Sequence, residues 1–128
     1  TSVANNGGGS DGIEFTLPKI SVSEGDDILL AREVATITGY FGTCINSFEH
    51  VIETSSLNQN GDDAIELYQG TDVIETYGDV IPDGTGEPWE YKGSWAYKVS
   101  GNWVNGALDC AAGSTSTQSS ACVYPACD

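Results

Sequence analysis

Apolar and polar residues alternate in short runs along this chain, a pattern that is typical of β-strands rather than helices. Residues 64–69 and 73–77 are two such runs, and the Gly-Thr-Asp cluster at 70–72 between them favours a turn. A β-hairpin is therefore predicted, with Ile65 and Leu67 on one face. Three further short runs of this kind are predicted to form strands: residues 13–17, 27–31 and 95–99.

The stretch from residue 33 to residue 56 departs from this alternating pattern. Ile45, Phe48 and Ile52 recur at a spacing that suits one or two helical turns, so a short helix is expected there. Residues 1–12 are polar and contain three consecutive glycines, which predicts a flexible N-terminal arm.

Several segments of the chain resemble the lamin-tail domain in its extracellular, secreted form. They are IEFTLPKISVSEGDDILLAR at 13–32, GDDAIELY at 61–68, VIETYGDV at 73–80 and, after a Pro-Asp-Gly-rich loop, PWEYKGSWAYK at 88–98. The resemblance covers roughly residues 12–100. It implies an immunoglobulin-like β-sandwich used for binding, tethering and assembly, since members of this family accompany secreted nucleases and other exported enzymes without doing their chemistry.

The expected fold is therefore all-β, with one short helix in 33–56 and an irregular tail tied by disulfides. The expected parts are the arm at 1–12, the lamin-tail-like sandwich at 13–109 and the Ser/Thr-rich, cysteine-bounded tail at 110–128. The two opening strands usual in the family have no counterpart before Ile13. A sheet that lacks a strand exposes unpaired backbone groups and apolar surface. Three explanations stay open: a trimmed domain, a C-terminal tail that folds back, or a strand donated by a neighbouring subunit.

Composition limits the function classes. At 128 residues the chain is long enough for one domain with a core. Four basic residues against nineteen acidic ones give a net charge of −15, which repels phosphate backbones, so no nucleic-acid partner is expected. No apolar run approaches the length of a membrane-spanning helix, so no transmembrane segment is expected. A chain that starts at Thr1 would fit a processed, exported product.

The four cysteines are Cys44, Cys110, Cys122 and Cys127, and no Cys-x-x-Cys pair is present. Zinc is a poor interpretation of this spacing. An even number of cysteines in an acidic chain predicts two disulfides and an extracellular or cell-surface location. Three connectivities are possible, and the sequence does not choose among them. Two predicted pairings stand out: Cys122–Cys127 together with Cys44–Cys110, or a rival arrangement that joins Cys110 to Cys122.

The sequence offers no catalytic signature. His50 is the only histidine, and a lone histidine is usually a surface or packing residue. The Gly-x-Ser-x-Gly pattern at residues 8–12 lies in the polar, glycine-rich N-terminal stretch, without the strand and helix that flank a nucleophile elbow. The strand alternation places Glu66 and Glu75 on the solvated face, which argues against a glycosidase pair. We therefore expect no catalytic residues and no required cofactor.

Calcium is the candidate metal, because acidic loops supply the oxygen ligands that it prefers. Asp62, Asp63 and Asp79 are the expected ligands, although none of the acidic loops has EF-hand spacing. The simpler interpretation is that Asp62 and Asp63 cap a turn through nearby backbone N–H groups.

Carbohydrate or another partner is a further candidate ligand. Trp89, Tyr91 and Trp103 supply flat rings of the kind that sugar-binding platforms use, but core packing explains some of these rings equally well. The chain has no Asn-x-Ser/Thr sequon, so N-linked sugar is not expected. Candidate O-glycosylation positions lie in the tail: Ser114, Thr115, Ser116 and Thr117.

Together these features predict a non-enzymatic, extracellular structural protein. The specific hypothesis is a subunit of a surface fibre that self-associates into a homopolymer, with its arm or tail completing a neighbour's sheet. The alternative is an accessory binding domain of a secreted enzyme that recognises carbohydrate or a calcium-dependent partner.

Overall fold

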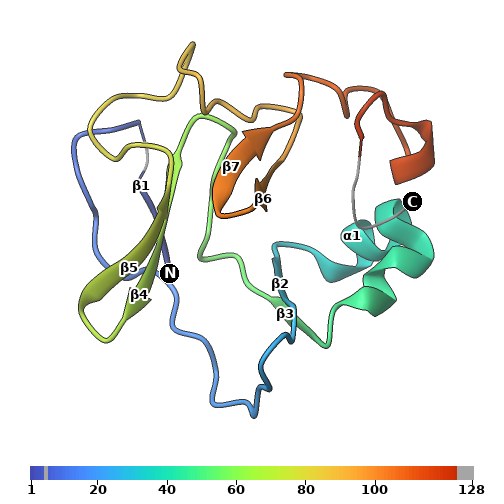
Figure 1. Cartoon of the computed structure of the whole chain (residues 1–128). Coiled ribbons are helices and arrows are strands. Elements are labelled where there is room, and N and C mark those ends of the chain that lie inside the picture. Colours follow the sequence, from blue (N-terminus) through green and yellow to red (C-terminus); the bar gives the residue numbers. More distant parts are fainter. Residues whose placement is uncertain (5, 124–128) are drawn as a thin grey trace.

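The computed structural model describes residues 1–4 and 6–123 (Figure 1). Strands in three small sheets and one short α-helix form a β-rich fold, which confirms the predicted class. The antiparallel sheet β1-β4-β5 contains Ser2–Ala4, Ala64–Gln69 and Asp72–Tyr77. The parallel pair β2-β3 contains Ile28–Ala31 and His50–Glu53, and the antiparallel pair β6-β7 contains Ala96–Val99 and Asn102–Asn105. The helical segments are α1 (Val34–Phe41) and the 3-10 turns Gly42–Ser47 and Thr117–Ser119.

The predicted hairpin is confirmed as β4 and β5. Ile65 lies opposite Tyr77, and the register shifts beside Leu67 and Tyr68. The predicted solvated position of Glu66 is wrong, because this side chain is only 3% exposed while Leu67 is 41% exposed. Burial is tolerated because the Ser10 and Tyr68 hydroxyls donate hydrogen bonds of 2.7 and 2.9 Å to the two Glu66 carboxylate oxygens.

The expected flexible arm is wrong as a description of residues 1–12, because Ser2–Ala4 form strand β1 along β4. Val3 lies opposite Ile65 and is fully buried. The N–H groups of Gly8 and Gly9 donate to the carbonyls of Ile81 and Val80. This strand has only one large apolar residue, Val3, so no alternating pattern marks it in the sequence. Its pairing with β4 is what stabilises it.

The strand predicted at residues 13–17 is also wrong. This segment forms no strand, although the Glu14 and Phe15 N–H groups donate to the Thr1 carbonyl. The chain then runs from residue 16 to residue 27 outside the sheets, along the lower edge of the view in Figure 1, before it enters β2.

The strand predicted at 27–31 is confirmed as β2, and its parallel partner β3 follows through a helical crossover. A short helix does form within 33–56, as α1, but its position differs from the prediction, because Ile45, Phe48 and Ile52 all lie beyond its end. The Glu53 carboxylate accepts a hydrogen bond of 2.9 Å from the Val34 N–H at the start of α1. A negative charge there favours the helix, because N–H groups at a helix N-terminus lack backbone acceptors.

A disulfide joins Cys110 to Cys122, which is the second of the two predicted pairings. Cys44 is also disulfide-bonded, and Cys127 lies outside the described residues. The Tyr40 hydroxyl lies 2.7 Å from Ser114 Oγ, which brings the tail against α1. Within the described ranges, no helix has the length and apolar character required to cross a bilayer.

Candidate functional site

Tyr77, at the end of β5, is the centre of an aromatic cluster that we call the Tyr77 cluster. Its ring meets those of Trp89, Tyr91 and Trp103 edge to face, at centroid distances of 6.3, 5.3 and 4.9 Å. Edge-to-face contacts are favourable because the positive edge of one ring meets the negative face of another. The three residues predicted to bind carbohydrate are therefore brought together, around a tyrosine that the sequence analysis did not single out.

The Tyr77 hydroxyl connects three segments of the chain. It donates to the Trp89 carbonyl and lies 2.8 Å from Asn105 Oδ1, while Asn105 Nδ2 donates to the Pro88 carbonyl at 2.7 Å. Burial raises the pKa of Tyr77 to about 12. Burial also raises the pKa of Tyr91, with the negative charge of Asp63 as the next cause. Both phenols are consequently neutral structural groups at physiological pH.

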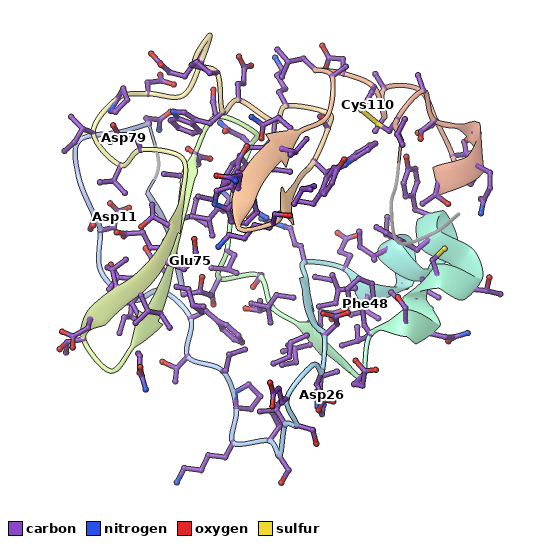
Figure 2. The ribbon with its side chains drawn as sticks, viewed as in Figure 1. Asp11, Asp26, Phe48, Glu75, Asp79 and Cys110 are labelled. Carbon is purple, nitrogen blue, oxygen red and sulfur yellow. A yellow bond between two sulfur atoms is a disulfide. The ribbon has the colours of Figure 1, made fainter. Side chains whose placement is uncertain are left out.

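Trp89 and Trp103 occupy different environments within the Tyr77 cluster. The Trp89 ring packs so closely on Gly78 and Gly84 that a Cβ atom at either glycine would overlap it. Trp103 is 40% exposed, and Lys98 Nζ lies 5.1 Å from its ring centroid. Lys98 also pairs with Glu75 of β5 at 2.6 Å (Glu75 is labelled in Figure 2). Trp89 and Tyr91 thus serve packing, and Trp103 is the ring that offers a solvent-facing surface.

The predicted calcium ligands are mainly occupied by the protein's own donors. Asp63 is fully buried, and its two oxygens accept the N–H groups of Asn6 and Asn60 at 3.1 and 2.9 Å. Asp62 Oδ2 accepts from the Thr85 hydroxyl at 2.7 Å, and its other carboxylate oxygen is buried without a hydrogen-bond partner among the described residues.

Asp79 Oδ1 accepts the Ile81 N–H at 2.9 Å, so this carboxylate also caps a turn. Figure 2 places Asp79 at the opposite end of the molecule from Asp26. Across residues 1–4 and 6–123, no three His, Cys, Asp or Glu side chains converge in a way that could hold a metal ion.

His50 lies in β3, where its Nε2 is 3.4 Å from Asp26 Oδ2. Asp26 Oδ2 also accepts the Ser23 N–H at 2.7 Å, so the carboxylate closes the turn before β2. The contact between His50 and Asp26 holds this turn against β3. Neither residue of the pair is a hydroxyl or thiol nucleophile.

The candidate O-glycosylation residues differ in accessibility. Thr115 is exposed, whereas Thr117 is buried. Ser116 Oγ accepts the Ser119 N–H as the cap of a short 3-10 turn, and Ser114 Oγ donates to the Ala111 carbonyl. Thr115 is therefore the position whose side chain is best presented to a modifying enzyme.

A hollow of about 260 Å³ lies beside the C-terminal end of β4. Apolar side chains from residues 13–17 and from β4 line much of it, including Ile13, Phe15, Leu17 and Leu67. Two further shallow hollows lie at the carboxyl ends of β2 and β3, around Arg32 and Gln59. All three hollows open to solvent, and none of them is an enclosed cavity.

Comparison of the chain with protein-family models, with curated proteins and with solved structures gave no match.

Proposed function

We propose that this protein is a non-enzymatic, extracellular structural subunit that self-associates into a filament or fibre. The observation that carries the proposal is the amount of surface that the isolated chain leaves exposed. Its accessible surface is 7781 Å², whereas a folded monomer of 13.4 kDa is expected to expose about 6,500 Å².

The difference of about 1,300 Å² exceeds the roughly 800 Å² that each partner buries in a standard protein–protein interface. Among the described residues, the buried apolar side chains are Val3, Ala31, Ala64, Tyr77 and Cys110. Covering exposed apolar surface with another copy would add to the stabilisation that such a small core provides.

The exposed apolar residues are not scattered evenly over the molecule. Several are in the segment before β2 and in the β4–β5 hairpin: Ile13, Leu17, Ile20, Val22, Leu67, Val73 and Ile74. This distribution supports contacts made by extended backbone and sheet edges. An extracellular location is part of the proposal, and the Cys110–Cys122 disulfide supports it because such bonds persist in oxidising compartments.

The proposal includes the immunoglobulin-like sandwich that the lamin-tail resemblance implies. The β4–β5 hairpin supports it, since the hairpin contains residues that carry the resemblance. The parallel pairing of β2 with β3 argues against it, because sandwiches of this class pair their strands antiparallel.

Electron microscopy combined with light scattering on the purified protein tests the proposal. We expect regular filaments, or a molecular mass that rises with protein concentration. A monomer at every accessible concentration would contradict the proposal and favour the accessory-domain alternative, for which Trp103 is the exposed ring. Glycan arrays and calcium titration would then be the next measurements.

A further inference from the structure

We propose that residues 16–22 of one copy add as a strand to the free edge of β5 in a second copy, so that copies join head to tail. This inference rests on the proposed function and assigns the two surfaces that would carry the assembly. We call residues 16–22 the docking segment.

The docking segment begins at the end of the strand predicted at 13–17 and is unpaired in the structure; it contains Pro18, which has no N–H to donate to a sheet. In the part of the chain that the structure describes, residues 16–22 make no hydrogen bond, and all of them are exposed. Leu17, Ile20 and Val22 are 37, 37 and 55% exposed. Apolar side chains and unsatisfied backbone groups on one stretch are the features of a strand that completes another sheet.

The sheet β1-β4-β5 offers one open edge for such a strand. On the β1 side, Val3 N–H donates to Glu14 Oε2 at 2.6 Å and the Thr1 carbonyl accepts from residues 14 and 15, which occupies that edge. On the other side, no strand among the described residues pairs with β5. An unpaired edge strand presents a row of N–H and C=O groups to a partner.

The lengths of the two elements agree. At about 3.3 Å per residue, the seven-residue docking segment spans roughly 23 Å and the six-residue β5 roughly 20 Å. Val73 and Ile74 on β5 are 42 and 54% exposed, so apolar side chains are available on both partners. The register of the hairpin skips Ile74, so β5 has a bulge at this residue, and an added strand would have to follow it.

Charge favours this pairing over contacts elsewhere on the molecule. The docking segment has one charged residue, Lys19, in a chain whose net charge is −15. The β5 strand has Asp72 and Glu75; Lys98 already pairs with Glu75, whereas Asp72 has no ion-pair partner among the described residues. The positive charge of Lys19 would therefore be attracted to Asp72, where most other surfaces of two copies would repel each other.

Because the two surfaces differ, the contact is heterologous and leaves one free surface at each end of a growing chain. This predicts a complementation test with Ile20→Asp, which disables the docking segment, and Val73→Asp, which disables the β5 edge. Ile81→Asp is the matched control, because it makes the same change at a residue that is 69% exposed but belongs to neither surface. Circular dichroism verifies that each variant is folded.

We expect sedimentation velocity to show that wild-type and Ile81→Asp chains grow with concentration. Each of the other two variants alone should associate at least about tenfold more weakly. An equimolar mixture of Ile20→Asp and Val73→Asp should form 1:1 dimers that do not grow, since one intact surface of each kind remains.

The outcomes separate the inference from the proposed function. If wild-type chains assemble and both variants assemble equally well, or if the mixture forms no dimer, the head-to-tail contact is overturned while self-assembly stands. If Ile81→Asp weakens association as strongly, added charge and not these surfaces explains the loss, and the inference is overturned. A wild-type chain that stays monomeric overturns both.

Discussion

The Trp89 ring of the Tyr77 cluster packs closely against its neighbours, and two glycines allow the free-energy cost of disturbing this packing to be measured. Gly78 and Gly86 have nearly the same positive φ, 81° and 80°. A Cβ on Gly78 would lie 2.7 Å from Trp89 Cε3, whereas a Cβ on Gly86 would meet no atom within 4 Å. Gly86→Ala therefore isolates the backbone cost of a positive φ, which is about 1–2 kcal/mol.

We expect Gly78→Ala to lower the free energy of unfolding by about 1–3 kcal/mol more than Gly86→Ala, because Trp89 must move. Urea unfolding followed by tryptophan fluorescence measures both values. Equal losses in the two variants would mean that Trp89 is free to shift and that it is not a packing residue.

Asp63 provides a second residue-level prediction, which separates a structural carboxylate from a calcium ligand. Both of its oxygens accept backbone N–H groups in a fully buried position. In Asp63→Asn, the new NH2 group faces a backbone N–H, so we expect a loss of about 1–3 kcal/mol in the free energy of unfolding. The loss should be the same in calcium and in a chelator. Asp83→Asn is the control, because the Asp83 carboxylate lies on the exposed surface and accepts the Thr85 N–H. A loss that appears only when calcium is present would indicate that Asp63 is a metal ligand.

Between elements, the Tyr77 hydroxyl joins β5 to the loop at Trp89 and to Asn105 of β7, which makes stability sensitive to alkaline pH. Burial raises the pKa of Tyr77 from 10.0 to about 12. Below pH 10 the phenol is protonated in both folded and unfolded chains, so its contribution is fully present. Between pH 10 and about 12 the unfolded chain ionises first, and the contribution is lost.

Urea unfolding from pH 8 to pH 11.5 measures this dependence. We expect wild-type stability to fall above pH 10, and we expect a shallower fall in Tyr77→Phe, which has no phenol at this position. Tyr77→Phe should also be less stable at pH 8 by about 1 kcal/mol through loss of the hydrogen bond. Identical slopes in the two proteins would show that Tyr77 does not couple these elements.

The elements that the sequence predicted correctly are those with local signals. The β4–β5 hairpin has alternating residues and a turn cluster, and both of its strands form where expected. Long-range pairing was not predictable: β1 is stabilised by β4, sixty or more residues away, and the run at 13–17 finds no partner strand in the part of the chain that the structure describes. Of the candidate site, the three ring residues were identified, but not Tyr77 between them, because a tyrosine in a strand resembles any other β-forming residue. Likewise, the burial of Glu66 depends on hydroxyl donors from a distant segment and from its own strand.

For the whole molecule, the decisive balance is between exposed apolar surface, which favours association, and a net charge of −15, which opposes it. Repulsion between two such molecules acts over a Debye length of about 30 Å at 0.01 M salt and about 3 Å at 1 M. Contact between the docking segment and β5 is short-ranged and mostly apolar, so salt should screen the repulsion more than it weakens the attraction.

We therefore expect self-association to strengthen as sodium chloride rises from about 0.02 to 0.5 M, the range over which screening becomes short-ranged. Light scattering at fixed protein concentration measures this self-association.

Lys19→Glu tests the charge argument, because it replaces the one positive charge on the docking segment with a negative one. This variant should assemble more weakly than wild type at low salt and approach wild-type behaviour at high salt. Lys92→Glu makes the same change in net charge outside both surfaces and is the matched control. Assembly that weakens with salt would show that ion pairs, and not apolar burial, hold the copies together, and the area argument for self-association would fail.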